Sequence, residues 1–183
     1  MFVRRVRPDE SLRLRALRLR ALADAPSAFG STLAREEAFP DDVWQERAAH
    51  GAAGDDRVTY VAEEDDRWIG MATGLVDAER RLDLVGMFVE PAARGRQVGG
   101  ALVESVAAWA RRRGRQLHLW VTTTNEPALR LYRRSGFRPT GRTQPMDPHA
   151  LAAGARDGAR PVTRPESGAA PRGSRQARRG RSA

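Results

Sequence analysis

"EPAARGRQVGGALVESVAAWARRRG", residues 90–114, leads from an apolar stretch at residues 82–89, LDLVGMFV, into a long amphipathic segment. The turn between them holds two arginines and three glycines, namely Arg94, Gly95, Arg96, Gly99 and Gly100. A strand that enters a helix through such a turn presents unpaired backbone N–H groups and the positive end of the helix dipole. The stretch therefore predicts a turn that suits a phosphate.

Two common phosphate-binding sequences do not account for this turn. A dinucleotide fold carries its glycines after the first strand, with an acidic residue about 20 residues further on. This turn follows the fourth expected strand and lacks that acid. A Walker-type loop is excluded because the chain holds no Gly-Lys-Ser/Thr sequence. From this stretch alone, a surface turn with glycines for geometry only stays open as the alternative.

Composition limits the class of protein. The 183 residues are enough for one domain and an extension. The chain has no cysteine, which excludes disulfides and a thiol nucleophile and suits a cytoplasmic location. No segment has the roughly 20 apolar residues of a membrane span, so we expect a soluble protein without a membrane partner. All 32 basic residues are arginine, which weakens any argument from the net charge of +9.

Strands and helices alternate before the C-terminal part, which indicates an α/β class with a central sheet. In the first helix, Leu12, Ala16, Leu19 and Leu22 recur at helical spacing and predict its apolar face. We expect strands at residues 2–6, 58–64, 67–76, 82–89, 116–123 and from residue 137, the second and third forming a hairpin. Helices are expected from Pro8 to near Pro26, over 41–50, from Gly99 to about Arg113 and from Asn125 to Ser135.

Two blocks together resemble the GNAT superfamily of N-acetyltransferases. Residues 94–99, RGRQVG, are similar to its acetyl-CoA-binding pattern, Arg/Gln-x-x-Gly-x-Gly/Ala, except that Gln97 stands where the family usually has glycine. A second register, residues 96–101, also fits. If φ of Gln97 must be positive, glutamine costs about 1–2 kcal/mol there. The downstream block, NEPALRLYRRSGF, resembles the closing motif of the family through Asn125, Ala128, Tyr132, Gly136 and Phe137.

The resemblance covers residues 82–137 and implies a fold. It is a GNAT-like mixed α/β sheet (α+β layered), with flanking helices and two parallel strands that splay apart to admit the pantetheine arm of acetyl-CoA. Gly86 suits a bulge or a close ligand approach in the first of these strands. The cofactor residues implied are Met87, Phe88, Val89, Arg94, Gly95, Arg96, Gln97, Val98, Gly99, Gly100 and Asn125.

The resemblance also implies the chemistry, which is direct attack of a substrate amine on the thioester in a ternary complex. Tyr132 matches the catalytic tyrosine that protonates the leaving thiolate; its alternative is a packed helix aromatic. Asn125 is expected to cap its helix as well as to bind pantetheine. Candidates for the base are Asp83, Glu36, Glu37 and Glu90, each of which we interpret first as a solvated surface carboxylate.

Other partners are less specified. His118 alternates with Leu117 and Leu119 and is interpreted as a sheet-face histidine, and His50 and His149 form no metal-ligand cluster with it, so no metal is implied. The acceptor is a small-molecule or peptide amine that the sequence does not identify. The resemblance allows a homodimer.

The C-terminal part has a different composition. We expect residues 1–148 to form the acetyltransferase domain and residues 149–183, rich in Arg, Gly, Pro and Ala, to form a disordered tail. The family normally ends in a hairpin, but ARPVTRP at 159–165 has one valine between prolines, so the last strand is expected to be missing or replaced. A reading frame lost after about Pro148 is one hypothesis for this composition.

Two other functions remain as alternatives. Residues 146–183 carry a net charge of +5 against +4 for the rest of the chain, which allows unspecific, salt-sensitive binding to nucleic acid or another acidic surface. That segment has no aromatic residue to stack on bases, so no specific nucleic-acid partner is predicted. The second alternative is a domain that binds CoA without catalysis, because of Gln97 and the lost strand.

Overall fold

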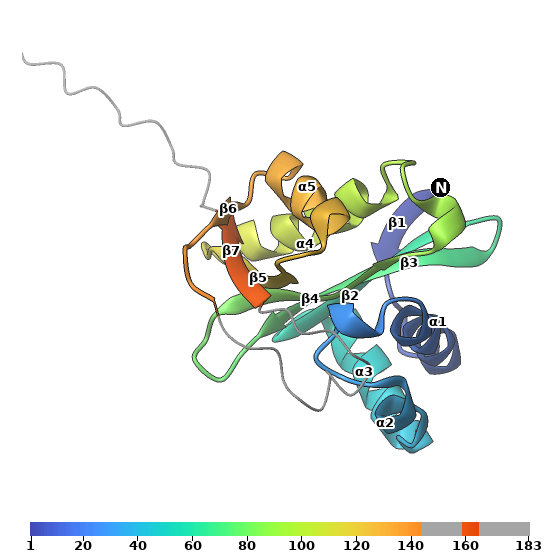
Figure 1. Cartoon of the computed structure of the whole chain (residues 1–183). Coiled ribbons are helices and arrows are strands. Elements are labelled where there is room, and N and C mark those ends of the chain that lie inside the picture. Colours follow the sequence, from blue (N-terminus) through green and yellow to red (C-terminus); the bar gives the residue numbers. More distant parts are fainter. Residues whose placement is uncertain (144–158, 165–183) are drawn as a thin grey trace, which may run out of the picture.

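The computed structural model describes residues 1–143 and 159–164. Within them a seven-stranded sheet runs in the order β1-β2-β3-β4-β5-β7-β6 (Figure 1). All neighbouring strands are antiparallel except β4 and β5, which are parallel. This confirms the predicted mixed sheet. The strands are β1 (Phe2–Arg5), β2 (Arg57–Glu64), β3 (Arg67–Val76), β4 (Leu82–Val89), β5 (Leu117–Thr122), β6 (Arg138–Pro139) and β7 (Ala159–Arg164).

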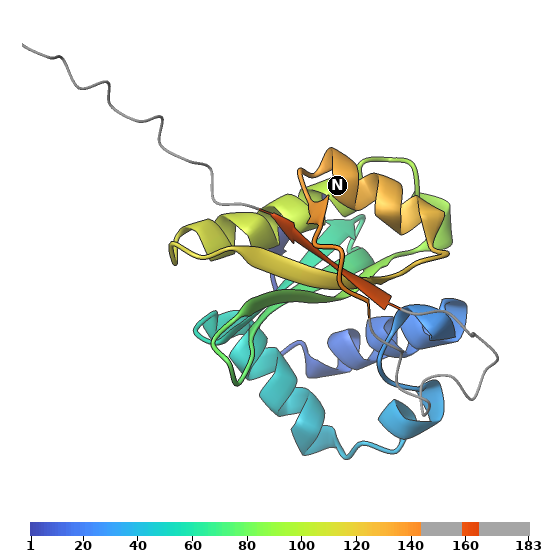
Figure 2. The same ribbon diagram turned by 60° about the vertical axis from the view of Figure 1, so that its left-hand side comes forward.

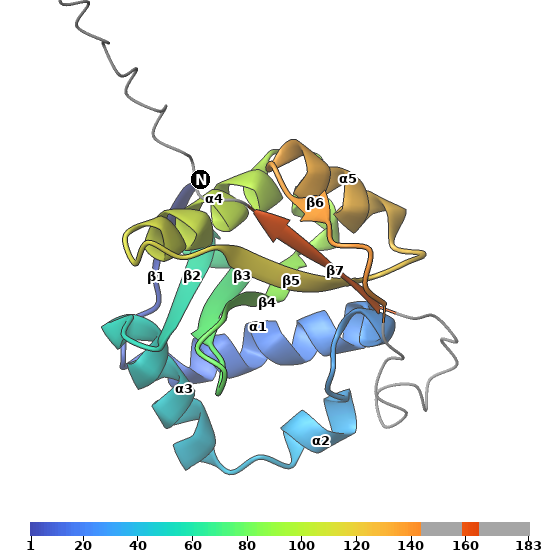
Figure 3. The ribbon, with the colours of Figure 1, turned by 90° about the vertical axis from the view of Figure 1, so that its left-hand side faces the viewer.

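Helices cover both faces of the sheet (Figures 1 and 3). One face carries α4 (Val98–Arg111) and α5 (Glu126–Arg134). The other carries α1 (Ser11–Asp24), α2 (Leu33–Glu37) and α3 (Asp41–Ala53). Single 3₁₀ turns, η1 (Pro26–Ala28) and η2 (Pro91–Ala93), follow α1 and β4. None of the helices in the described residues combines the length and the apolar character that crossing a bilayer requires.

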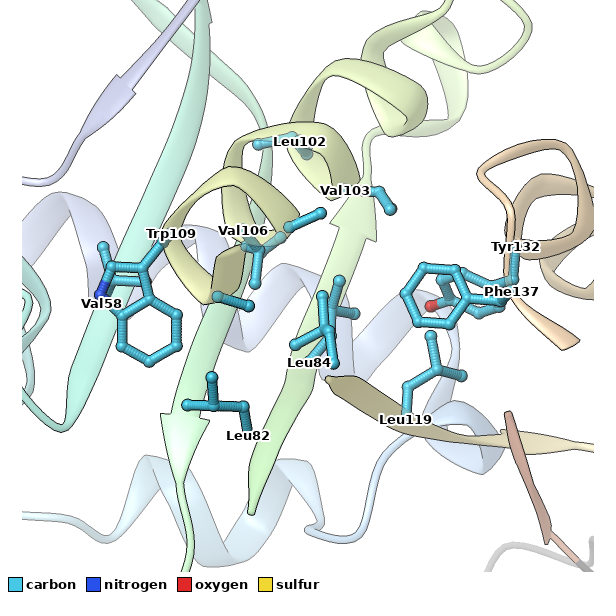
Figure 4. Close-up of a cluster of buried hydrophobic side chains, with 14 of the residues drawn as sticks. Val58, Leu82, Leu84, Leu102, Val103, Val106, Trp109, Leu119, Tyr132 and Phe137 are labelled. Carbon is cyan, nitrogen blue, oxygen red and sulfur yellow. The ribbon is translucent and has the colours of Figure 1, made fainter. Parts of the chain in front are cut away.

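The apolar stripe of α4 packs on the sheet as its periodicity predicts. Leu102, Val103, Val106, Trp109 and Ala110 are all buried there. Figure 4 shows this cluster beside Leu82 and Leu84 of β4, with Tyr132 and Phe137 at the α5 end. Burying such side chains is worth about 1.5–3 kcal/mol each, so this face contributes strongly to the stability of the fold.

The predicted stripe of α1 is wrong at Leu12 and Ala16, whereas Leu22 is buried and Leu19 is partly buried against the core. Leu12 is 69% exposed, and the buried residues are Leu14, Leu17, Ala21 and Leu22. Leucine recurs so often in this helix that it offers more than one stripe at helical spacing. The stripe that packs is the one next to Arg18, whose guanidinium pairs with a buried carboxylate on α2 and lies over the Phe29 ring.

The hairpin of β2 and β3 turns where it was predicted. Asp65 and Asp66 link the strands with φ of 49° and 59°. Two consecutive residues with positive φ are typical of a type I′ turn, whose twist matches that of the flanking strands, and aspartate tolerates this conformation.

Part of the expected C-terminal tail belongs to the sheet. Residues 159–164 form β7, which pairs antiparallel with β5 and with the short β6 (Figures 2 and 3). The expectation of a tail over all of 149–183 is therefore wrong at these six residues, and the last strand is not missing but formed by an unusual segment, the second of the two expected alternatives. A strand needs backbone pairing more than apolar side chains, and Pro161 stands opposite Trp120 of β5, beyond the last residue that β6 pairs. The remainder of the expected tail lies outside the described residues.

A bulge in β4 and its divergence from β5 shape the centre of the sheet. The register between β3 and β4 shifts between Met71 and Thr73, and Gly86 on β4 has φ of 62°. Beside the bulge, β4 pairs with β5 at Leu82–Leu117 and Asp83–His118 alone among the described residues. Both the bulge at Gly86 and the splay were predicted.

Candidate functional site

A cavity of about 600 Å³ opens where β4 and β5 separate and continues under α1 and α3. Its walls come from β2, β3, β4 and β5, from the loop between α1 and α2, and from α5. Met87, Asn125 and Tyr132, three of the predicted site residues, line it. The cavity therefore joins the opened centre of the sheet to the chamber between the sheet and the first helices.

The phosphate turn has the free donors that were expected of it. Within α4 the first amide with a helical acceptor is Ala101, which donates to the Gln97 carbonyl at 3.1 Å. The amides of Val98, Gly99 and Gly100 precede it and have no acceptor within the helix. A side-chain carbon at Gly95 or Gly100 would meet nothing within 4 Å, so the space on that side of these two glycines is open.

Gly99 is needed because the start of α4 packs closely against its neighbours. A Cβ there would lie 3.1 Å from a Leu131 methyl of α5 and 3.2 Å from the Met87 methyl of β4. Glycine thus lets the start of α4 approach β4 and α5, which brings the turn to the end of the cavity.

Gln97 occupies the strained position that its place in the pattern predicts. Its φ is 64° and its ψ is 2°, which is the left-handed conformation, and it precedes the first residue of α4. A non-glycine residue in this conformation costs about 1–2 kcal/mol. The backbone keeps the shape that glycine would favour, so the glutamine reduces stability without changing the turn.

Both arginines of the turn are already paired. Arg94 binds the Asp24 carboxylate at the end of α1 and donates from Nε to the Val89 carbonyl at 3.0 Å. Arg96 donates from Nη2 to both carboxylate oxygens of Glu64, at 2.6 and 2.8 Å. An arriving anion must therefore compete with acidic residues for these side chains, whereas the backbone amides are free of that competition.

The three predicted residues at the end of β4 have different surroundings. The Phe88 side chain packs in the core on the α1 face, and Val89 packs against the α4 core. Met87 faces the cavity. Beyond Asp83 this edge of β4 has lost its β5 partner, so its backbone borders the opening.

Tyr132 and Asn125 bring α5 to the cavity. Tyr132 is buried against Phe137, with ring centroids 5.7 Å apart, and its hydroxyl makes no hydrogen bond with a described residue. Burial raises the pKa of the Tyr132 phenol. Asn125 caps the helix as predicted, since its Oδ1 accepts the Ala128 N–H at 3.1 Å.

Glu36 is not the solvated carboxylate that we expected. It is 2% exposed and lines the cavity, held by Arg18 at 2.7 Å and Arg47 at 2.8 Å. Burial alone would raise the pKa of Glu36, but the hydrogen bonds and charges of the two arginines outweigh burial and lower it to about 2. Its position on the five-residue α2, which the sequence pattern did not predict, explains the error.

Asp83 also lines the cavity and differs electrostatically from Glu36. Burial raises the pKa of Asp83, the charge of Asp77 adds to the rise, and Arg81 and His118 oppose it. His118 lies beside it on β5 and faces away from the buried Leu117 and Leu119, as predicted. The other candidates lie elsewhere: Glu90 pairs with Arg20 at 2.7 Å, and Glu37 is exposed.

Two further cavity residues were missed by sequence reasoning. Arg57, the first residue of β2, is half-buried in the wall, and Trp120 of β5 borders the cavity with 40% of its surface exposed. Neither residue lies in a recognisable pattern, so only the fold reveals them.

Comparison with known proteins agrees with this geometry. The family model "Acetyltransferase (GNAT) family" matches residues 19–137, and the chain belongs to this family. The streptothricin acetyltransferase of Streptomyces lavendulae is 38% identical over 104 residues, which is 54% of each chain. The chain thus spans about half the length of that relative.

Two solved structures share the fold. A GNAT-family acetyltransferase from Streptococcus pneumoniae matches with a TM-score of 0.72 at 21% identity, over 89% of this chain and 97% of the other. The PaiA N-acetyltransferase of Thermoplasma acidophilum, in complex with coenzyme A, matches with a TM-score of 0.62 at 14% identity, over 87% and 96%.

Proposed function

We propose that the chain is an N-acetyltransferase that moves the acetyl group of acetyl-CoA directly to a primary amine in a ternary complex. The observation that carries this proposal is the cavity between β4 and β5, which has Tyr132 in its wall and whose lining residues Met87 and Leu131 lie against Gly99 at the start of α4. Membership of the GNAT family and the coenzyme A in the Thermoplasma structure support the same donor.

The amides from Arg96 to Gly100 would bind the pyrophosphate, since they stand free at the N-terminus of α4. The pantetheine arm would run along the freed edge of β4 at residues 87–89, with Asn125 across the opening. Because the Val89 carbonyl already accepts from Arg94, we expect Met87 and Phe88 to supply most of the backbone contacts.

Tyr132 would act as the acid. As the amine nitrogen bonds to the acetyl carbon, the C–S bond breaks, and the thiolate takes the phenolic proton. Burial raises the pKa of Tyr132 and so holds the phenol protonated at neutral pH, and the same shift makes it a weaker acid toward the thiolate. Solvent then reprotonates the phenolate.

Asp83 would receive the amine proton. Of the four carboxylates considered, Glu36 is held by two arginines, Glu90 by one, and Glu37 is exposed outside the cavity wall. Asp83 lines the cavity without an ion pair to any described residue, and its raised pKa makes it a better proton acceptor than an ordinary carboxylate.

The test combines binding with turnover. Acetyl-CoA should raise the thermal midpoint of the full chain in a dose-dependent way, and CoA thiol should appear when a pool of primary amines is added. A cooperative melt that acetyl-CoA leaves unmoved would contradict the donor. A shift without thiol release from any amine would favour a domain that binds CoA without catalysis.

A further inference from the structure

The part of the cavity that faces α1 and α3 carries more positive than negative charge. Three arginines line it, Arg18, Arg47 and Arg57, against two carboxylates, Glu36 and Asp83. Arg18 and Arg47 both bind Glu36, which leaves Arg57 and Asp83 outside that cluster. The charged groups that remain available to a ligand are therefore one cation, Arg57, and one anion, Asp83.

Arg57 makes no ion pair or side-chain hydrogen bond with any residue in the described part of the chain. It is half-buried, and it feels the like charge of Arg47. The half-buried Arg57 guanidinium lies near the charge of Arg47 and has no counter-ion of its own, which is unfavourable. The site therefore gains free energy when an anion binds to Arg57. The nearby Trp44 indole N–H also has no acceptor among the described residues, so donors are in excess in this wall.

The register of the sheet places Arg57 and Asp83 in one row. Arg57 of β2 is opposite Leu75 of β3, and Leu75 is opposite Asp83 of β4. Two strand spacings of nearly 5 Å separate their Cα atoms by about 10 Å. All three line the cavity. A molecule that bears an anion and a cation can lie along this row between them.

We infer that the acceptor is an amine that carries its own oxyanion, a carboxylate or a phosphonate, which Arg57 binds while the amine faces Asp83 and the thioester. The inference rests on the proposed function and names its substrate class. A guanidinium suits such a group because it donates two parallel hydrogen bonds to two oxygens. Polycationic amines are disfavoured, because they would meet Arg57 without an anion of their own.

The test uses matched acceptors with the full chain and acetyl-CoA. The probes are the L-α-amino acids, their carboxamides, 2-aminoethylphosphonate and the polycation spermidine, measured by binding calorimetry on the CoA complex and by thiol release. We expect at least one free amino acid or the phosphonate to be used about tenfold or more better than its neutral or polycationic counterpart, as one charged hydrogen bond allows. A preference for amino acids over 2-aminoethylphosphonate, or the reverse, distinguishes the two oxyanions.

Variants assign the preference to Arg57. Arg57→Gln should bring the ratio of carboxylate to carboxamide close to one, and Arg57→Lys should restore part of it. Arg112→Gln, which removes an equal charge at the exposed end of α4, should keep the full preference. Thermal melts with acetyl-CoA show whether each variant is folded; if Arg57→Gln is not, Arg57→Lys carries the comparison.

Equal use of acid and amide, a preference for spermidine that Arg57→Lys leaves unchanged, or no binding by any oxyanion probe would overturn the inference. Failure of the proposed function is a separate result, because it shows as a missing thermal shift with acetyl-CoA alone. Oxyanion binding that depends on Arg57 without that shift would contradict the donor and leave the anion site in place.

Discussion

The face of the sheet under α4 and α5 is packed with apolar side chains, whereas the face under α1, α2 and α3 holds a smaller apolar core beside buried carboxylates and arginines. The first face gives the phosphate turn its position and offers backbone amides to a ligand. The second offers charged side chains. A site that binds through backbone depends on local chain geometry, while one that binds through charges depends on residues from distant segments meeting in the cavity.

The largest effect is expected from a substitution at Tyr132, which packs in the apolar core and also lines the cavity. Tyr132→Phe removes the proposed acid and should lower kcat about 100-fold or more, with little change in the shift of thermal midpoint by acetyl-CoA. Tyr60→Phe makes the same chemical change on β2 and should keep most of the activity. If the kcat of Tyr132→Phe stays within a few-fold of the wild-type value, Tyr132 is a packing residue and not the acid.

The charged face should respond strongly to loss of its buried anion. Glu36→Gln leaves Arg18 and Arg47 without their shared partner, so we expect the free energy of unfolding to fall by about 3 kcal/mol. Urea denaturation measures this. Glu37→Gln on the same helix is exposed and should change stability by less than about 0.5 kcal/mol; equal effects of the two variants would show that the buried cluster is not special.

Acid should weaken the charged face through Glu36. The pKa of Glu36 is lowered from 4.5 to about 2 in the folded chain, so its contribution is complete above pH 4.5 and is lost as the pH falls toward 2. The wild type should lose about 3 kcal/mol more than Glu36→Gln over that interval. Parallel stability curves for the two proteins between pH 5 and pH 2 would contradict the assignment.

The smallest expected effect lies in the backbone of the phosphate turn. Gln97→Gly relieves a positive φ and should raise the free energy of unfolding by about 1 kcal/mol. It should also preserve or improve acetyl-CoA affinity, since it adds no atoms near the open amides. Gln116→Gly, outside any helix or strand, is the matched change and should stabilise nothing. A destabilised Gln97→Gly chain would mean that the glutamine side chain makes a contribution of its own.

The backbone-based half of the site could be predicted from the sequence because its determinants are local. Glycines, a helix start and strand periodicity fall within residues 82–137, so the turn, the bulge at Gly86 and the cap at Asn125 followed from neighbouring residues. The positive φ of Gln97 was also foreseeable, because the position in the pattern fixed the conformation whatever residue stands there.

The charged half could not be predicted in the same way. Glu36 meets Arg18 and Arg47 from three helices, and no periodicity within one helix reveals such a meeting. The stripe of α1 was misassigned because leucines occupy several of its faces. The strand β7 was missed because its pairing with β5 depends on backbone hydrogen bonds, which apolar patterning does not report.

In the described residues β4 and β5 share only two residue pairs, so the sheet has a weakly hydrogen-bonded junction in its interior. On one side lie β1 to β4, and on the other lie β5, β7 and β6. Segments with few shared hydrogen bonds can open separately, each with its own free energy. The β4 amides that point toward β5 beyond Asp83 should therefore exchange with deuterium as fast as those of an outer strand, although they lie in the middle of the molecule.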